Sequence, residues 1–204
     1  AMQRLQAAHG VPAPTMIGHR QFVWGERPAI IGIVNVTPDS FSDGGQFVDL
    51  LQSMLHVEKL LEEGADIVDV GGESTRPGSL GVSAEEELRR VVPLVKSISK
   101  RFPSALISID TSKAEVARAA IAEGASMVND VTAFGDRLMA KVVAESGVAA
   151  CLMHMRGTPR TMQDDTQSDD LMAEIIGWLG NAVACAEREG IAKSKLIVDP
   201  GIGF

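Results

Sequence analysis

Short apolar runs alternate with longer amphipathic stretches along most of this chain. The short runs fit strands that are buried on both faces, as in a parallel sheet. Between them, apolar residues recur at the three- and four-residue spacing of a helix that buries one face. The pattern predicts strands at Ile30–Val34, Asp66–Val70, Leu106–Asp110, Ser126–Asn129, Val148–Met153 and Leu196–Asp199.

The stretches between these strands predict helices, and pairs of Ser and Glu indicate where two of them begin. Ser83 with Glu86, and Ser112 with Glu115, each match a capping box, in which both side chains bind free backbone N–H groups of the first turn. The expected helices cover Leu50–Leu61, Ser83–Ile98, Ser112–Gly124, Leu138–Val143 and Leu171–Ala186. A hairpin is expected before the first strand, over Met16–Pro28, with a turn at Trp24–Arg27.

This alternation predicts an α/β fold. Glu63–Asp69 and Glu123–Asn129 repeat one pattern of helix end, glycine, strand and polar residue, which is typical of βα units. The number of units favours a (β/α)8 TIM barrel over a doubly wound sheet. Such a barrel usually needs about 250 residues. The 204 residues reach only the sixth expected strand, so we expect the last strands and helices to be absent and the chain to be part of a longer polypeptide.

We divide the chain into two segments on the basis of this pattern. Residues 1–15 have little hydrophobic pattern and are expected to form a flexible N-terminal segment. Residues 16–204 are expected to form one barrel domain that is C-terminally incomplete, and the hairpin at its start is a candidate plug for the bottom of the barrel. No shift in composition marks a second domain.

Charge and composition exclude several classes of partner. The net charge is −8 and the isoelectric point about 5.0, which argues against binding to nucleic acid or to anionic membranes. No apolar run approaches the ~20 residues of a membrane span and no signal peptide is apparent, so we expect a cytoplasmic protein. Cys151 and Cys185 are too few for a disulfide framework and are expected to be buried thiols.

Polar residues follow the expected strands at their carboxyl ends. In a parallel barrel all these ends lie on one rim, where such folds bind their ligands. A single Asp or Asn at a strand end usually caps a helix or anchors a loop, but several around one rim indicate a ligand site. The expected rim residues are Asn35, Asp69, Asp110, Asn129, His154 and Asp199.

Two loop motifs resemble those of a known family. Asn35–Gly45 reads Asn-Val-Thr-Pro-Asp-Ser-Phe-Ser-Asp-Gly-Gly and closely resembles the first loop of dihydropteroate synthases, and Gly71–Gly78 matches their second mobile loop. The resemblance spans nearly all of residues 16–204. It implies a transferase of folate biosynthesis, the target of sulfonamides, that condenses p-aminobenzoate with 6-hydroxymethyl-7,8-dihydropterin diphosphate to give 7,8-dihydropteroate and diphosphate.

The same resemblance implies a role for each matching residue. The implied pterin contacts are Asp110, Asn129, Met153 and Asp199, the diphosphate contact is Thr75, and the p-aminobenzoate pocket includes Phe41, Arg76 and Pro77. Mg²⁺ is the implied cofactor, with Asn35 helping to hold it on the diphosphate. Catalytic roles are implied for Asn35, Asp110 and Asp199.

The chemistry of these residue types agrees with a pterin ligand. A carboxylate can accept two parallel N–H groups of the aminopyrimidine edge, and an Asn side chain supplies both a donor and an acceptor. Met153 fits either the face of the pterin or plain core packing, and both interpretations stay open. His154 fits an anchored loop histidine, and we assign it no catalytic role.

Two other functions compete with the synthase. A methyltransferase domain that binds methyltetrahydrofolate shares the barrel and the Asp/Asn pterin contacts, but Thr37–Gly45 and Gly71–Gly78 suit a diphosphate that such a donor lacks. A non-catalytic pterin-binding fragment is favoured by the absence of counterparts to a late Lys, Arg and His of the family. The expected partners are small-molecule substrates, and a full-length chain is expected to form a homodimer.

Overall fold

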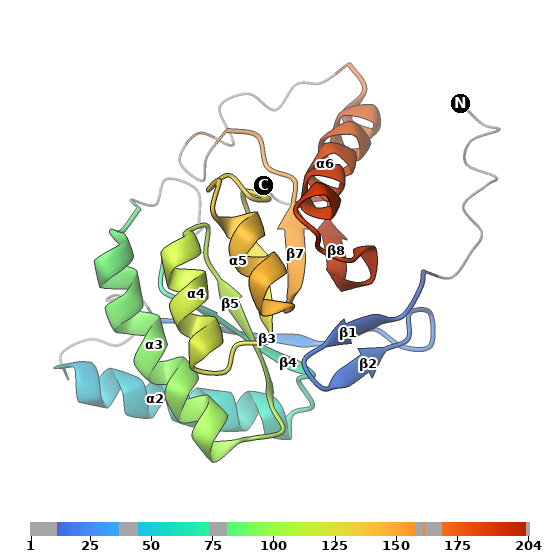
Figure 1. Ribbon diagram of the computed structural model, residues 1–204. Helices are drawn as coiled ribbons and strands as arrows, with labels where there is room; N and C mark the ends of the chain where they lie inside the picture. The colour runs from blue at the N-terminus through green and yellow to red at the C-terminus, as the bar shows by residue number, and fades with distance from the viewer. Residues whose placement is uncertain (1–11, 37–44, 74–80, 158–160, 162–168, 203–204) are drawn as a thin grey trace.

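Helices pack on the outer face of a curved parallel sheet in this protein (Figure 1). The structure is a computed structural model, and it describes residues 12–36, 45–73, 81–157, 161 and 169–202. The strands of the sheet are β3 (Ile31–Asn35), β4 (Ile67–Gly71), β5 (Leu106–Asp110), β6 (Met127–Asp130), β7 (Ala149–Met153) and β8 (Leu196–Asp199). The helices are α2 (Gly45–Glu62), α3 (Ala84–Arg101), α4 (Ala114–Ala122), α5 (Met139–Ser146), α6 (Leu171–Arg188) and the 3-10 helix η2 (Lys193–Lys195).

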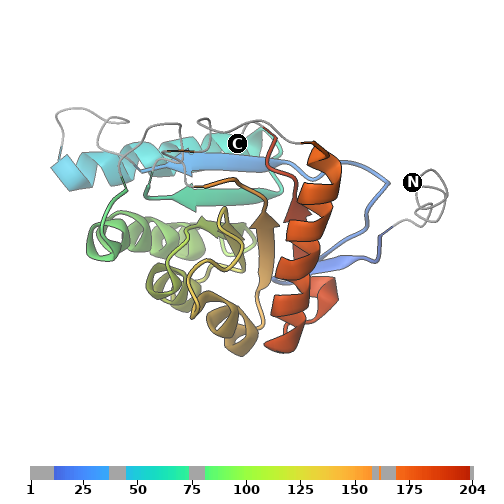
Figure 2. The same cartoon turned by 90° about the horizontal axis from the view of Figure 1, so that it is seen from above.

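The sheet follows the order of the chain. Within the described residues it has six strands, ordered β3-β4-β5-β6-β7-β8, and every neighbouring pair is parallel. The helices lie one after another around the outside of the curved sheet, as a view from above shows (Figure 2). These observations confirm the predicted α/β alternation. In the described part of the chain β3 and β8 are the edges, so these strands form an open sheet and not a closed barrel.

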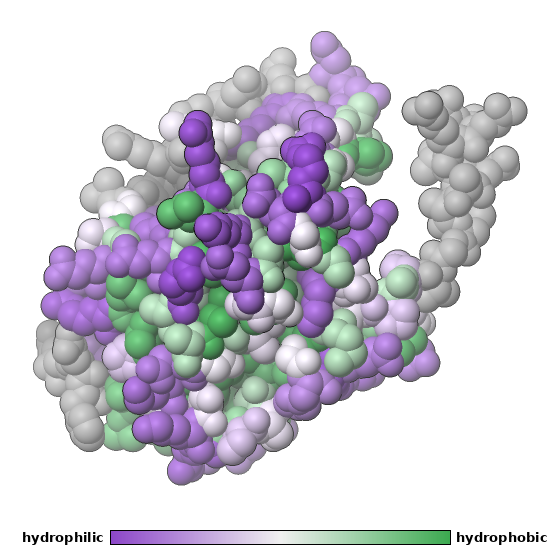
Figure 3. Space-filling view, in the orientation of Figure 1, coloured by the Kyte–Doolittle hydropathy of each residue, from purple (hydrophilic) through white to green (hydrophobic). Residues whose placement is uncertain are grey.

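The main core lies between the sheet and the helices. Side chains alternate along each strand, so Val68 and Val70 of β4 and Ile107 and Ile109 of β5 all point outward to the helices. They are fully buried there, and burying a side chain of this size contributes about 1.5–3 kcal/mol. On the other side of the helices, polar and charged residues are interspersed with small apolar patches (Figure 3). No helix among the described residues has the length and apolar character that a membrane crossing requires.

A small hairpin covers the amino-terminal ends of the strands. Its strands are β1 (Thr15–Ile17) and β2 (Arg20–Phe22), which pair antiparallel. Ile17 and Phe22 form a second core with the first residues of four strands, Ile67, Leu106, Met127 and Ala149. The expected plug is therefore present on the inner side of the sheet. β1 begins at Thr15, the last residue of the segment that was expected to be flexible.

The position predicted for the turn of this hairpin is wrong. The tight turn consists of Gly18 and His19, and Gly18 has a φ of +55°, a conformation that glycine adopts without strain. The turn expected at Trp24–Arg27 is present, but it lies outside the hairpin, between β2 and β3. Its Trp24 donates a hydrogen bond from Nε1 to Thr15 Oγ1 at 3.0 Å, which ties this turn to β1.

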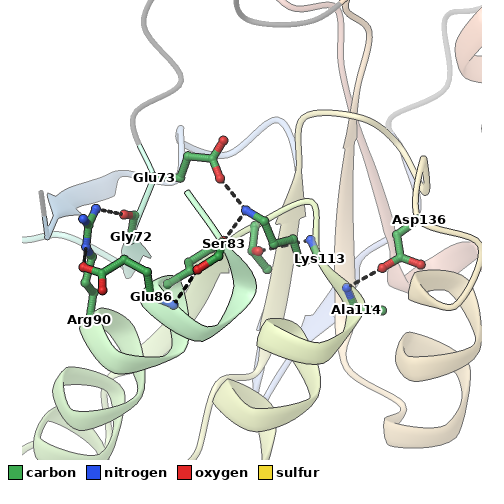
Figure 4. Close-up of polar contacts among 10 residues, drawn as sticks. Gly72, Glu73, Ser83, Glu86, Arg90, Lys113, Ala114 and Asp136 are labelled. Atoms are coloured by element: carbon green, nitrogen blue, oxygen red, sulfur yellow. Dashed lines mark hydrogen bonds and ion pairs between the residues drawn. The ribbon is translucent and has the colours of Figure 1, made fainter. Parts of the chain in front are cut away.

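One of the two predicted helix caps is confirmed and the other is wrong. Ser83 Oγ accepts a hydrogen bond from the backbone N–H of Glu86 at 3.2 Å, which is the contribution of the Ser residue to a capping box. The helix α4 begins one position later than predicted, with Lys113 at its N-cap and no side-chain cap bond from that residue. Asp136, in the loop before α5, reaches across instead, and its Oδ2 accepts from the N–H of Ala114 at 2.9 Å (Figure 4).

Candidate functional site

Four positions on neighbouring strands form one row near the carboxyl rim of the sheet. The strand register pairs Asn35 with Gly71, Gly71 with Asp110, and Asp110 with Asn129. The Oδ1 atom of Asn35 lies 3.1 Å, and the Oδ2 atom of Asp110 3.5 Å, from the point where a Cβ atom of Gly71 would stand. The structure therefore brings three of the predicted residues together, and Gly71 leaves the space that their side chains use.

Asp69 lies below this row. It was predicted as a strand-end residue, but β4 continues to Gly71, so Asp69 pairs with Ser108 inside the sheet. It is 6% exposed, and its Oδ2 accepts a hydrogen bond from Asn129 Nδ2 at 3.1 Å. Burial raises the pKa of Asp69, while the hydrogen bond from Asn129 acts in the opposite direction.

Asp110 has several other carboxylates as neighbours. Burial, followed by the neighbouring charges of Asp69, Glu87, Asp130 and Glu73, holds the pKa of Asp110 well above its ordinary value. A group in this environment favours a ligand that presents N–H donors or positive charge, because such a ligand stabilises the carboxylate. The row is therefore suited to a ligand that presents several N–H groups.

Asp199 and Met153 lie on the last two strands of the sheet and pair with each other in register. Asp199 Oδ1 accepts a hydrogen bond from the N–H of Gly201 at 2.8 Å. Gly201 has a φ of +71°, and a Cβ atom there would lie 2.0 Å from the carbonyl oxygen of His154, so only glycine fits. Met153 is 4% exposed and packs with Val131 and Met155.

His154 contacts α6 and not the row of carboxylates. It is buried, and its ring meets Trp178 edge-on, with ring centroids 5.5 Å apart. Its Nε2 lies 3.7 Å from Glu174 Oε1. The backbone N–H of His154 also donates to the carbonyl oxygen of Asp199 at 2.9 Å, which joins the ends of β7 and β8. This placement agrees with an anchoring role.

Cys151 is a neighbour of the site that sequence reasoning treated only as a buried thiol. It pairs with Asn129 in register, so it lies on the inner face of β7. Burial and the charges of four carboxylates, those of Asp199, Asp69, Asp110 and Asp130, raise the pKa of Cys151 to about 12. The thiol therefore stays protonated near neutral pH.

An ion-pair network next to Asp110 was not predicted. Lys113 Nζ contacts Glu73, just after β4, and lies 2.5 Å from Oε2 of Glu87 on α3 (Figure 4). Glu87 is only 1% exposed, and nothing in the sequence of an amphipathic helix separates such a buried Glu from solvated ones. Glu73, Glu87 and Asp110 line one cavity of about 60 Å³.

The base of the second loop is held from α3 as well. Arg90 donates from Nη1 to the carbonyl oxygen of Gly72 at 2.8 Å, and its Nε donates to Glu86 at the same distance (Figure 4). These contacts fix the chain as it leaves β4. The predicted site residues Phe41, Thr75, Arg76 and Pro77 lie outside the described residues.

Comparisons with known proteins show which family this chain resembles. The family model described as pterin binding enzyme matches residues 31–204. Dihydropteroate synthase of Escherichia coli strain K12 is 48% identical over 177 residues, which are 87% of this chain and 62% of that enzyme. The chain therefore spans less than two thirds of that relative.

Two solved structures share the fold. Dihydropteroate synthase of Yersinia pestis, in a complex with a sulfonamide drug, is 42% identical with a TM-score of 0.86, covering 94% of this chain and 69% of that one. Dihydropteroate synthase of Xanthomonas albilineans with 4-aminobenzoic acid is 44% identical with a TM-score of 0.84, covering 94% and 67%. Because the family model matches most of the sequence, this chain belongs to the pterin binding enzyme family.

Proposed function

We propose that this chain supplies the pterin and diphosphate end of a dihydropteroate synthase, which condenses p-aminobenzoate with 6-hydroxymethyl-7,8-dihydropterin diphosphate. The observation that supports this most is the row of Asn35, Asp110 and Asn129, which faces the space above Gly71. The relatives with a bound sulfonamide or 4-aminobenzoic acid support the choice of second substrate.

In this proposal Asp110, Asn129 and Asp199 bind the pterin ring. The two carboxylates accept its N–H groups, and Asn129 supplies the remaining acceptor or donor. The reaction breaks the C–O bond to the diphosphate before the amine of p-aminobenzoate attacks, so positive charge develops on the pterin. The carboxylates of Asp110 and Asp199 are already in place to stabilise that charge, and such preorganised charge is usually the largest catalytic term.

Mg²⁺ fits this site as an ion shared with the substrate. It prefers oxygen ligands, keeps several waters, and commonly takes one or two protein oxygens together with phosphates. Asn35 offers an exposed amide oxygen at the rim, and no group of three or more His, Cys, Asp or Glu side chains gathers around a possible ion among the described residues. Asn35 would therefore hold the ion only together with the diphosphate, and the bound ion would neutralise that leaving group.

Diphosphate release tests the proposed reaction. We expect the chain, or a longer form of it, to release diphosphate from the pterin substrate only when p-aminobenzoate is present. Binding of 6-hydroxymethylpterin without any release would instead support a non-catalytic pterin-binding role. Failure to bind the pterin would contradict the proposal.

Asp199→Asn provides a matched test of pterin binding. The substitution keeps the shape of the side chain but replaces an acceptor oxygen that faces the ligand with a donor N–H group. The loss of one charged hydrogen bond lowers the binding free energy by about 1.5–3 kcal/mol. We expect calorimetric titration to show at least about tenfold weaker pterin binding with unchanged cooperative unfolding. Unchanged affinity would remove Asp199 from the site.

We also propose a cytoplasmic location and a homodimer for the longer polypeptide. Cys151 and Cys185 are free thiols, which suits a reducing compartment. Exposed apolar side chains at Leu171, Met172 and Ile176 of α6 offer a surface for a second copy. Light scattering of the purified protein measures the assembly state directly.

A further inference from the structure

The buried carboxylate of Asp69 holds one end of the Asn129 side chain. The two residues are on β4 and β6, with β5 between them, and the hydrogen bond runs from Asn129 Nδ2 to Asp69 Oδ2 at 3.1 Å. The side chain of Asp69 starts one row below that of Asn129, because Asp69 pairs with Ser108 and Asn129 pairs with Asp110. The bond therefore reaches Asn129 from below and from within the sheet.

This contact determines which way the amide faces. The Oδ2 atom of Asp69 accepts the hydrogen bond here, so the carboxylate selects the Nδ2 end of the Asn side chain. The amide is planar, and its oxygen is therefore directed away from Asp69, toward the partly exposed rim above. Without a fixed partner the two ends of an Asn amide have almost the same shape and can exchange by rotation about χ2.

We propose that Asp69 is a positioning residue of the pterin site: it fixes the amide of Asn129 so that the Oδ1 atom is presented to the ligand as a hydrogen-bond acceptor. This inference rests on the proposed function, since the ligand is taken to be a pterin. It assigns Asn129 the acceptor role, alongside the acceptors Asp110 and Asp199. The rim would then present a set of acceptors to a ligand edge made of adjacent N–H donors.

The burial of Asp69 suits this role. A side chain that is 6% exposed, inside a sheet strand, has little freedom to move and holds its partner in a defined geometry. Burial raises the pKa of Asp69, and the bond from Asn129 counteracts that rise. A fixed partner of this kind lowers the cost of ordering the amide when the ligand binds.

Two variants and their combination test the proposal. In Asp69→Asn the carboxylate becomes an amide that can either donate or accept, so Asn129 is no longer held in one orientation. We expect about tenfold weaker binding of 6-hydroxymethylpterin by calorimetry, as for the loss of one charged hydrogen bond. Asn129→Asp places a second carboxylate against Asp69, and we expect a larger loss there.

The exchanged double variant, Asp69→Asn with Asn129→Asp, is the decisive protein. It keeps the total charge, and residue 69 now donates its amide N–H to a carboxylate at 129. That carboxylate still presents an oxygen to the ligand. We expect affinity to return to within about threefold of the wild type, a rescue that a merely structural role of Asp69 would not produce. If either single variant does not fold, the exchanged variant can still be compared with the wild type, because it retains both the charge and the hydrogen bond.

Asp130→Asn is the matched control. Asp130 is also a fully buried acid and follows Asn129 directly, but its side chain points to the outer face and binds Thr132 and Phe134. We expect Asp130→Asn to change the free energy of unfolding and to leave the pterin affinity within about threefold of that of the wild type. A comparable loss in this control would mean that any buried charge change disturbs the site.

Measurements without ligand separate this inference from the proposed function. In the wild type, the side-chain N–H protons of Asn129 should show one hydrogen-bonded, slowly exchanging NMR signal that Asp69→Asn removes. A wild type with this signal but no pterin binding would overturn the proposed function and the ligand role of Asn129. A wild type that binds the pterin while Asp69→Asn binds equally well would overturn only the positioning role. An exchanged variant that folds but binds no better than the single variants would also overturn it.

Discussion

Gly71 contributes to the candidate site through the side chain that it lacks. Its neighbours Asn35 and Asp110 have their side-chain oxygens 3.1 and 3.5 Å from the position of an added Cβ atom. A contact of 3.1 Å is shorter than ordinary van der Waals contact, so the amide of Asn35 would have to move. The backbone of Gly71 is an ordinary extended strand, and the substitution would therefore disturb the site more than the fold.

We expect Gly71→Ala to weaken the binding of the pterin diphosphate by about tenfold and to change the free energy of unfolding by less than about 1 kcal/mol, because a displacement of this size costs about one hydrogen bond. Calorimetric titration and urea unfolding measure the two quantities. Gly177→Ala on α6 is the control, since an added Cβ there meets no atom within 4 Å. It should leave binding unchanged. Equal affinity in Gly71→Ala would show that the oxygens of Asn35 and Asp110 can move freely.

Single residues of the site differ in how far the sequence could predict them. Asp110 and Asn129 could be predicted because parallel strands end at a common rim, and the structure places both in one row. The bond between Asn129 and Asp69 could not, since the partners are 60 positions apart and their side-chain directions depend on the exact register. Asp69 was expected at a strand end only because the end of β4 was predicted one residue early.

At the scale of elements, the start of α4 depends on a residue from the next βα unit. The N–H of Ala114 is bound by Asp136, and Ser112 lies before the N-cap position. We expect Asp136→Ala to lower the free energy of unfolding by about 1 kcal/mol, as for the loss of an N-cap. Ser112→Ala should change the free energy of unfolding by only about a few tenths of a kcal/mol. A larger effect of Ser112→Ala in urea unfolding would restore the predicted capping box.

The hairpin is attached to the parallel sheet by a buried carboxylate. Asp66 accepts hydrogen bonds from Arg27 at 2.8 and 2.5 Å and from the N–H of Ile30, and it also pairs with Arg20. The hydrogen bonds from Arg27 hold the pKa of Asp66 well below its ordinary value. A lowered pKa means that the folded state binds the proton less tightly than the unfolded state. The stabilisation is therefore complete above about pH 4, the unfolded value, and is lost as the pH falls through the folded pKa.

We expect Asp66→Asn to lower the stability at pH 7 by about 1–2 kcal/mol, because both arginines are about half exposed and water weakens their ion pairs. The difference from the wild type should shrink as the pH is lowered below about 4. Glu145→Gln, which removes an exposed ion pair with Arg118, is the control and should cost less than about 0.5 kcal/mol. Thermal unfolding at pH 7 and pH 3.5 measures both, and a difference that is independent of pH would exclude this linkage.

Elements were more predictable than the contacts between them. β5 and β8 have the bounds expected from the apolar runs, because each run begins at a Leu and is closed by an Asp. The turn of the hairpin was misplaced, since Gly18-His19 and Gly25-Glu26 are both plausible turn pairs in the sequence. Packing of Ile17 and Phe22 against the ends of the barrel strands decides between them, and that packing is a long-range interaction.

At the scale of the whole molecule, the open sheet has two edges whose side chains are exposed. Ile33 on β3 is 60% exposed and Val198 on β8 is 49% exposed. Within the described residues these two strands have a strand partner on one side only. Unpaired edges with apolar side chains tend to pair with other chains. Residues 1–204 as a free polypeptide should therefore associate through β3 or β8 as the concentration rises.

We expect Ile33→Lys to reduce this association, because a charge on an edge strand opposes pairing with a second strand. Light scattering over a dilution series measures it, with the fold checked by circular dichroism. Leu138→Lys is the matched control, since Leu138 is 61% exposed but lies at the start of the helix α5. If the control reduces association and Ile33→Lys does not, the contact between chains is made by the helix surface. If neither variant changes it, the edge strands are not the sites of association, and the exposure of Ile33 has no such consequence.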